Sequence, residues 1–223
     1  MEHNKNKGFT IVETMIAVVI FTLIASIATF VTIQLSRSYQ YGISKSKLDT
    51  SARNVNYLFN QAVQYSNSTA LMGSAVQPTH TSFGTLNTWK VWCAGTTRFS
   101  AQISGAVLYQ KSFYRDTIDP TAGGEIAACK GTPLSSSKVQ LIPDNASISL
   151  FEVSQSGSIF RLRTAFEIGQ LSDFVGSNAT TSLSSDANGN ILPKLPVCQT
   201  QAFGSFSYCA IVYYDNSVTS FIN

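Results

Sequence analysis

The sequence contains little charge and almost no histidine. Only 12% of its 223 residues are charged, about half the usual share for a soluble domain, and 15 lysines and arginines face 12 acidic residues. No dense run of lysine or arginine is present, so nucleic acid is not indicated as the main partner. The histidines are His3 and His80, and no Walker A, G-x-G-x-x-G or H-E-x-x-H string occurs. We therefore expect a protein that is not an enzyme and that has neither a metal site nor a cofactor.

Proline is also scarce, and the first one in the chain is Pro78. A helix that starts early therefore meets no proline for a long distance. The four cysteines are Cys93, Cys129, Cys198 and Cys209, and no two of them form a C-x-x-C pair. An even number of cysteines without this spacing is compatible with disulfides in an oxidising compartment. Together with the abundance of neutral polar residues, this favours a location outside the cytoplasm.

The longest apolar stretch lies near the N-terminus. Thr14 to Leu35 is an uncharged run of 22 residues, which spans about 33 Å as a helix and matches the bilayer core. A secretory signal would be shorter, although Ser26-Ile27-Ala28 loosely fits a cleavage site, and a buried core helix would need a larger domain around it. A plain anchor fits the length but leaves Glu13 unexplained, because a charge inside such a span costs roughly 2.5–3.5 kcal/mol on insertion scales. We interpret the run as a membrane-spanning helix with a functional carboxylate near its start.

The residues around Glu13 carry a resemblance to a known family. The stretch from Lys7 to Ala17, KGFTIVETMIA, resembles the prepilin cleavage and methylation motif of type IV pilins and type II secretion pseudopilins. That motif has a basic leader ending in glycine, then phenylalanine, then three residues and glutamate, then the apolar helix. The resemblance implies that the prepilin peptidase, a membrane-embedded aspartic peptidase, cuts between Gly8 and Phe9 and methylates the new amine of Phe9. Glycine before the cut suits an extended backbone in a narrow protease cleft.

The resemblance also implies a role and partners for the mature chain. Glu13 would pair with the N-terminal amine of a neighbouring subunit, and such a pair fixes the axial register because it demands correct placement. The implied partners are the prepilin peptidase, other pilin subunits through their N-terminal helices, the inner membrane, and the pilus or secretion assembly machinery. The implied location is the bacterial inner membrane as a single-pass protein, and then an extracytoplasmic filament at the cell surface.

Charge alone does not orient the membrane span. Lys5 and Lys7 precede it, whereas Arg37, Lys45 and Lys47 follow it, so the positive-inside rule favours neither orientation. The short leader and the resemblance imply a cytoplasmic N-terminus.

The helix is predicted to continue beyond the apolar run, from Phe9 to about Asn67. Its second half carries an apolar stripe with spacings of four and three residues, which indicates that one face packs on a domain. The stripe consists of Leu48, Ala52, Val55, Phe59, Ala62 and Ser66. We predict four segments: a leader over 1–8, a transmembrane and assembly helix over 9–36, an amphipathic continuation over 37–70 and a β-rich globular head over 71–223.

The head is predicted to be mainly antiparallel sheet. Strand patterns at 147–153 and 158–168 flank Gln155-Ser156-Gly157 and predict a hairpin, and further strands are predicted at 90–93, 106–114, 138–142 and 208–214. The polar segment 172–193 is predicted to be an exposed loop. The expected fold class is α+β, with a long N-terminal helix packed on a mainly antiparallel sheet, as in pilins.

The disulfide pairing is left open by the sequence. Cys198 and Cys209 are eleven residues apart, which suits a bridge that closes a C-terminal loop, and the resemblance to pilins implies the same pairing. Cys93 would then pair with Cys129. Four cysteines nevertheless allow three pairings, and their spacing does not choose among them.

Two functional hypotheses follow. The first is a minor pilin or minor pseudopilin, a structural subunit whose mature length of 215 residues (223 minus 8) is large for a pilin. The alternative is a membrane-anchored adhesin or binding module that is not assembled into a filament and binds through head aromatics. Those aromatics, Trp89, Trp92, Tyr213 and Tyr214, are instead predicted to belong to the core. Motility, secretion, adhesion and DNA uptake stay open, as do the abundance of the subunit in a filament, a position at its tip and a DNA or host-surface ligand.

Overall fold

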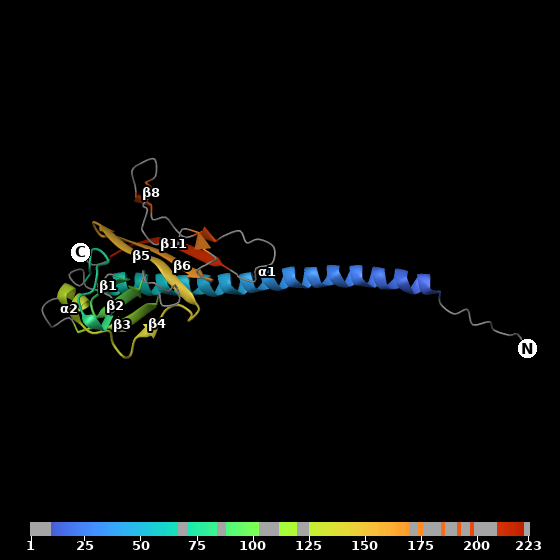
Figure 1. Ribbon diagram of the computed structural model, residues 1–223. Helices are drawn as coiled ribbons and strands as arrows, with labels where there is room; N and C mark the ends of the chain where they lie inside the picture. Colours follow the sequence, from blue (N-terminus) through green and yellow to red (C-terminus); the bar gives the residue numbers. More distant parts are fainter. Residues whose placement is uncertain are drawn as a thin grey trace, which may run out of the picture. The chain divides into compact units, whose positions relative to one another are not determined.

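The computed structural model describes most of the chain after residue 9, and the predicted leader and Phe9 lie outside the described part. The chain divides into two compact units, Met1–Gln40 and Tyr41–Asn223. Figure 1 shows the helices and strands that these units contain. The described residues are 10–66, 71–83, 88–102, 112–119, 125–169, 174–175, 184–185, 191–192, 197–198 and 209–220.

Helix α1 (Ile11–Tyr65) has 55 residues and runs through the end of the first unit into the second. The predicted helix over 9–67 is confirmed, with each end two residues inside the predicted limit. The sequence between Ile11 and Tyr65 contains no proline and a single glycine, Gly42, so nothing in it breaks the helix.

In the second unit one face of α1 is buried. The buried residues are Ser44, Leu48, Ala52, Val55, Phe59 and Val63. The predicted stripe is correct from Leu48 to Phe59 and wrong at its end, because Ala62 and Ser66 are half-buried whereas Val63 is fully buried. A repeat of four and three residues has a period of 3.5 and drifts by about 20° per heptad around a straight helix. The observed stripe instead follows 11-residue spacings, a period of about 3.7, and so stays on one side.

The first sheet of the head has the strand order β1-β2-β3-β4 and is antiparallel throughout. Its strands are β1 (Trp89–Ala94), β2 (Thr97–Gln102), β3 (Phe113–Thr117) and β4 (Val139–Gln140). Gly95 has a φ of 56° in the turn between β1 and β2, a conformation that glycine adopts without strain. The strands predicted at 90–93 and 138–142 correspond to β1 and β4. The one predicted at 106–114 lies mostly outside the described residues and meets β3 at Phe113.

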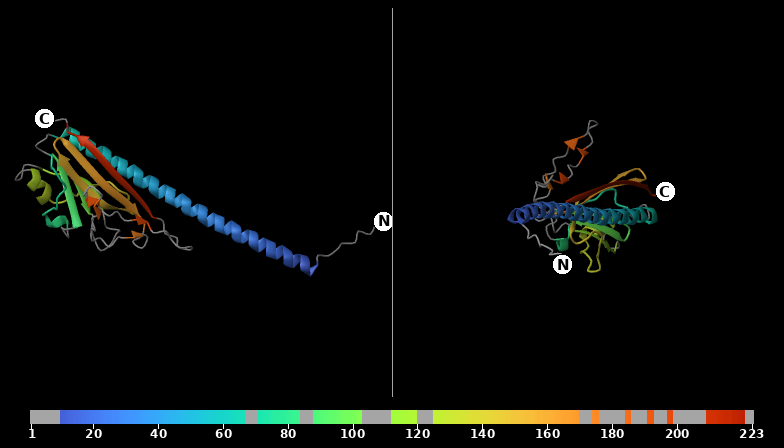
Figure 2. Two further views of the ribbon diagram at one scale, coloured as in Figure 1. Left: turned by 90° about the horizontal axis from the view of Figure 1, so that it is seen from above. Right: turned by 90° about the vertical axis from the view of Figure 1, so that its right-hand side faces the viewer.

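The second sheet has the order β11-β6-β5 and is also antiparallel. Its strands are β5 (Ala146–Ser156), β6 (Ile159–Ile168) and β11 (Ala210–Thr219). The predicted hairpin is confirmed as β5 and β6, which turn at Gly157 with a φ of 60°. The strand predicted at 208–214 corresponds to β11, which continues to Thr219. Figure 2 shows the strands of this sheet beside the second half of α1.

The segment 71–76 links the edges of the two sheets. On one side Met72 N–H donates to the Cys93 carbonyl at 3.1 Å, and Val76 exchanges both backbone hydrogen bonds with Val91 of β1. On the other side Ala75 N–H donates to the carbonyl of Val153 in β5 at 3.4 Å. This segment therefore hydrogen-bonds to the edge strand of each sheet at these residues.

Trp92 is the centre of the hydrophobic core. Its ring centroid lies 4.7 Å from that of Phe59 in α1, 5.8 Å from that of Phe99 in β2 and 6.4 Å from that of Phe160 in β6. The indole Nε1–H donates to the carbonyl of Met72 at 2.7 Å, so the buried ring leaves no unpaired donor. The core thus joins the helix to both sheets.

The prediction that the head aromatics are core residues is confirmed for Trp89 and Trp92 and wrong for Tyr213. Trp89 and Trp92 are buried, Tyr214 is partly buried against the core, and Tyr213 is 41% exposed. Successive residues of a strand point to opposite faces, so adjacent tyrosines in β11 cannot both face the core.

Some elements were not predicted, and one predicted loop is partly ordered into strands. β2, the 3₁₀ turn η2 (Thr81–Phe83) and the short helix α2 (Glu125–Gly131) have no counterpart in the sequence-based expectations. The segment 172–193 contains β7 (Phe174–Val175), β8 (Ser184–Ser185) and β9 (Ile191–Leu192). β8 pairs with β9, and β7 pairs with β10 (Val197–Cys198). The prediction of a plain loop is therefore wrong at these residues, two pairs of which are apolar and suit a strand.

Candidate functional site

The start of α1 is held by a reciprocal pair of side chains. The Oε2 atom of Glu13 accepts hydrogen bonds from the backbone N–H and the hydroxyl of Thr10, both at 3.0 Å, and the hydroxyl of Thr10 accepts from the N–H of Glu13 at 3.3 Å. This arrangement is a capping box, which satisfies backbone donors that the first turn of a helix leaves free. Glu13 was predicted from the sequence as a functional residue, whereas Thr10 was not. The spacing T-x-x-E directly before an apolar run is the signal that would have found it.

The predicted processing site adjoins this cap in the sequence. Gly8 and Phe9 lie outside the described residues, so the cleavage site and the methylated amine stay predictions. Thr10, the residue that follows Phe9, is the N-cap of α1, and the helix therefore begins within two residues of the predicted new N-terminus.

The apolar run of the first unit is exposed along its length. Among the described helices, α1 is long and apolar enough to cross a membrane, and none of its most apolar stretch is buried within the chain. The side chains of Ile11, Phe21 and Leu35 leave 71–80% of their surface uncovered. Large uncovered apolar surfaces mark contacts with lipid or with other proteins. The interpretation of the run as a core helix of this chain is thereby excluded.

Hydroxyl groups within the run are paired with the helix backbone. Thr14, Thr22 and Ser26 donate to the carbonyl three residues earlier at 2.8–2.9 Å, and Thr29 and Thr32 donate to the carbonyl four residues earlier at 2.8 Å. In hydrocarbon an unpaired polar group costs several kcal/mol, and these five groups avoid that cost. The run is therefore compatible with a membrane despite its serine and threonine residues.

A polar seam fixes the second half of α1 to β11. The Tyr214 hydroxyl donates to Oδ1 of Asp49 at 2.9 Å, while Arg53 Nε donates to Oδ2 of the same carboxylate at 2.9 Å. Further along, Asn216 Nδ2 donates to Oδ1 of Asn60 at 2.8 Å. Burial and the hydrogen bond to Asp49 raise the pKa of the Tyr214 phenol above its ordinary value. The seam adds directional contacts to the apolar stripe beside it.

A second Arg–Asp pair lies on the opposite, outward side of the same sheet. Arg161 donates to both carboxylate oxygens of Asp215, and the hydrogen bond from Arg161 lowers the pKa of that carboxyl despite partial burial. The side chains of Arg161 and Asp215 are 52% and 30% exposed. An ion pair this accessible to water contributes little to stability.

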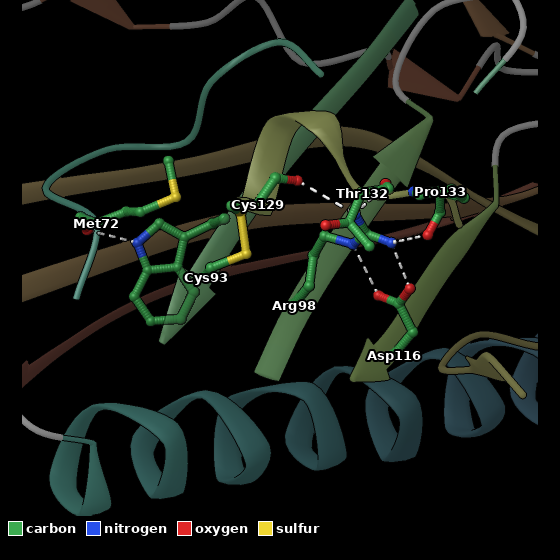
Figure 3. The surroundings of a disulfide bond; sticks show 8 residues. Met72, Cys93, Arg98, Asp116, Cys129, Thr132 and Pro133 are labelled. Atoms are coloured by element: carbon green, nitrogen blue, oxygen red, sulfur yellow. Dashed lines mark hydrogen bonds and ion pairs between the residues drawn. A yellow bond between two sulfur atoms is a disulfide. The ribbon is translucent and has the colours of Figure 1, made fainter. Parts of the chain in front are cut away.

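A buried ion pair lies between β2, β3 and the chain after α2 (Figure 3). The side chains of Arg98 and Asp116 have no exposed surface, and Arg98 Nε donates to Oδ1 of Asp116 at 2.9 Å while Nη2 donates to Oδ2. The remaining guanidinium donors reach the carbonyl oxygens of Cys129, Thr132 and Pro133 at 3.2, 2.8 and 3.0 Å. The hydrogen bond to Cys129 is buried and those to Thr132 and Pro133 are partly buried, and together they tie three backbone carbonyls to β2 and β3.

The structure contains two disulfides. Cys93 in β1 is bonded to Cys129 in α2, and Cys198 at the end of β10 is bonded to Cys209 just before β11. This is the pairing that the sequence analysis preferred. The first bridge is adjacent to the Arg98 cluster, because the Cys129 carbonyl is one of the acceptors of Arg98 (Figure 3).

Within the described ranges, no group of three or more histidine, cysteine, aspartate or glutamate side chains is arranged to hold a metal ion. The half-buried His80 accepts a hydrogen bond at Nδ1 from the Ser82 N–H at 3.0 Å, with the Ser82 hydroxyl also 3.0 Å away. These contacts close a local turn at η2.

Comparison with known proteins gives one match. Residues 3–29 match the family model of the prokaryotic N-terminal methylation motif. No curated protein and no solved structure matches the chain. The matched segment contains the predicted cleavage site, Thr10, Glu13 and most of the apolar run. Together with the long helix and the antiparallel head, it gives the chain the N-terminal signature and the α+β architecture of a type IV pilin or pseudopilin.

Proposed function

We propose that this chain is the precursor of a minor pilin or minor pseudopilin, a structural subunit of a type IV pilus or a type II secretion-like filament. The observation that carries the proposal is the conjunction of the methylation motif with an apolar helix that its own chain leaves uncovered. A signal that is cut off and discarded does not need such a helix to remain attached to a folded head. A filament subunit does need it, because the helix lies in the membrane first and against other subunits later.

The proposed sequence of events uses the four predicted segments. The prepilin peptidase removes residues 1–8 by cutting after Gly8 and methylates the amine of Phe9. The helix over 9–36 stays in the inner membrane with its N-terminus toward the cytoplasm, while 37–70 continues it and 71–223 forms the head outside. The disulfides Cys93–Cys129 and Cys198–Cys209 support this placement of the head, because such bonds persist in oxidising compartments.

In this proposal the carboxylate of Glu13 has two alternative hydrogen-bond partners, one in its own chain and one in a neighbouring subunit. In the single chain its carboxylate is occupied by the N–H and hydroxyl of Thr10. In a filament it would accept from the methylated amine of Phe9 in a neighbouring subunit, which adds a charge–charge interaction in a low-dielectric setting. The capping box keeps the carboxylate satisfied until a neighbour with the correct axial register arrives.

The minor role rests on the size of the head. The mature chain would have 215 residues (223 minus 8), and the described part of the head contains a four-stranded sheet, a three-stranded sheet, two pairs of short strands and two disulfides. A large head suits a subunit that primes assembly or lies near a filament tip.

The test compares Glu13→Gln with Glu13→Ala in cells that assemble the filament. Glutamine can still complete a capping box but carries no charge, whereas alanine removes both functions. The proposal predicts that both variants insert and are cleaved, and that both are depleted from sheared filaments. If Glu13→Ala reaches the cell surface in wild-type amounts, the chain is a membrane-anchored binding module rather than a filament subunit. If Glu13→Gln assembles normally while Glu13→Ala does not, the role of Glu13 is local capping and not pairing between subunits.

A further inference from the structure

The part of α1 that follows the apolar run has an unusual composition. From Thr14 to Leu48 the chain contains no acidic residue, and the segment 36–47 carries Arg37, Lys45 and Lys47 together with Tyr39 and Tyr41. We call residues 36–47 the interfacial segment. Tyrosine and basic residues directly beyond an apolar span are typical of the membrane–water boundary. With a cytoplasmic N-terminus, Arg37, Lys45 and Lys47 follow the extracytoplasmic end of the span, where the positive-inside rule does not predict basic residues.

Two tyrosines and two lysines of the interfacial segment are exposed. Tyr39 is 70% exposed and Tyr41 is 45% exposed, and both Lys45 and Lys47 are exposed. At 1.5 Å per residue, the tyrosines lie about 6–9 Å beyond Leu35 along the helix and the lysines about 15–18 Å. Side chains on a helix lean toward its N-terminus, which brings the lysine amines back toward the apolar run. The Lys45 ammonium, 6.0 Å from the ring centroid of Tyr41, shows this lean.

The distribution of these side chains around the helix indicates the kind of partner. With 100° per residue, Lys45 lies about 100° to one side of the buried Ser44 and Lys47 about 60° to the other side. Tyr39 and Tyr41 are likewise on different flanks. A groove on a partner protein would need these groups on one face. A lipid surface surrounds the helix and can contact all of them.

We propose that the interfacial segment binds the headgroups of anionic phospholipids in the leaflet where the membrane span ends. Positive charge, aromatic rings and the continuity with the apolar run all fit such a surface. The contact sets how far the helix emerges from the membrane. Of the proposed function, this inference uses only the insertion of the helix into a bilayer.

The test measures lysine acetylation in the full-length chain, reconstituted in vesicles of phosphatidylcholine alone or mixed with phosphatidylglycerol. A surface potential of about −30 to −50 mV concentrates protons, so amines at an anionic surface should react about three- to sevenfold more slowly. We expect this slowing at Lys45 and Lys47 in the mixed vesicles and its loss at about 0.5 M salt, where screening is strong. Lys130 of α2 is the internal control. α2 lies at the end of the head where α1 ends (Figure 1).

The outcomes separate this inference from the proposed function. Equal reactivity of Lys45 and Lys47 in the two kinds of vesicle overturns the inference, and so does equal slowing of Lys130. Slowing of Lys45 and Lys47 by inorganic phosphate in detergent, without vesicles, also overturns it, because a phosphate site would then suffice. A chain that fails to float with either kind of vesicle contradicts membrane insertion and with it the proposed function.

A double variant tests the same surface with a readout other than lysine acetylation. Lys45→Gln combined with Lys47→Gln should leave insertion into phosphatidylcholine unchanged. In the wild type, we expect hydrogen exchange of the backbone amides of residues 36–47 to be slower in mixed vesicles than in vesicles of phosphatidylcholine alone. The double variant should lose most of this difference. The control is Lys130→Gln together with Lys138→Gln, which removes two head lysines and should keep the wild-type difference. Loss of the difference in both double variants, or in neither, contradicts the assignment to the interfacial segment.

Discussion

Removing the carboxylate of Asp116 should destabilise the head far more than removing the carboxylate of Asp215. Both residues form paired hydrogen bonds with an arginine, Asp116 with Arg98 and Asp215 with Arg161. The chemical groups and the geometry are alike, and the environment differs. The first pair has no exposed surface, whereas the side chains of the second are 52% and 30% exposed.

The expected magnitudes follow from that difference. Asp116→Ala leaves the guanidinium of Arg98 buried beside neutral groups, namely the three carbonyl oxygens and the Phe83 ring 5.1 Å away, and an uncompensated buried charge costs about 3–5 kcal/mol. Asp215→Ala breaks a pair that water already screens, which costs about 0.2–1 kcal/mol. For a chain of this length each kcal/mol corresponds to about 2–4 °C in the melting temperature. Asp116→Ala should therefore lower it by about 6–20 °C and Asp215→Ala by less than about 4 °C.

The assay is thermal and denaturant unfolding of the full chain in detergent, followed by near-ultraviolet circular dichroism. Trp92 is the centre of the core, so its signal reports the head rather than the membrane helix. Similar losses of stability for the two variants would refute the reasoning. A loss for Asp215→Ala that exceeds the loss for Asp116→Ala would refute it more strongly.

Three further predictions concern the seam, the cap and the first disulfide. The pKa of the Tyr214 phenol is raised in the folded state, so the stabilisation that this residue provides is complete below the ordinary tyrosine pKa near 10. The stabilisation is lost as pH rises through the higher folded-state pKa. Tyr214→Phe should therefore flatten the decline of the unfolding free energy between about pH 9 and 11. An unchanged decline in the variant would contradict this. Thr10→Val removes a helix cap worth about 0.5–2 kcal/mol and should reduce incorporation into filaments without blocking cleavage. The control variant Thr14→Val should assemble normally. A wild-type yield of filaments from Thr10→Val would argue against a role of the cap in assembly. Replacing both Cys93 and Cys129 by serine removes a disulfide with a sequence separation of 36. The free energy of unfolding, measured with denaturant, should fall by about 4 kcal/mol. A fall of less than about 1 kcal/mol would show that the Arg98 cluster alone holds α2 in place.

The N-terminal half of the molecule could be predicted from sequence because its determinants are local. The absence of proline, the length of the apolar run and the spacing around Glu13 each depend on neighbouring residues only. The hairpin of β5 and β6 was predictable for the same reason, since it needs two alternating strands and the glycine at its turn, Gly157. The end of the buried stripe was not predictable in this way. Ala62 and Val63 are adjacent, and the period of the stripe around the helix, 3.5 or about 3.7 residues, decides which of them faces the head.

The interior of the head could not be predicted in this way because its contacts are remote in sequence. Arg98 finds Asp116 eighteen residues away and the Pro133 carbonyl thirty-five away. The charge of Arg98 suggests an exposed residue, and only the surrounding acceptors make its burial possible. The seam between Tyr214 and Asp49 joins residues 165 positions apart, and no local pattern indicates it.

The most direct measurement of the central claim is the intact mass and the N-terminal peptide of the chain isolated from native membranes, compared between wild type and Gly8→Val. The account predicts a wild-type chain that begins at Phe9 and carries one added methyl group, and a variant that retains its leader because valine obstructs the extended backbone at the cut. A wild-type chain that begins at Met1, or one cut near Ala28, would contradict prepilin processing and the filament function proposed here.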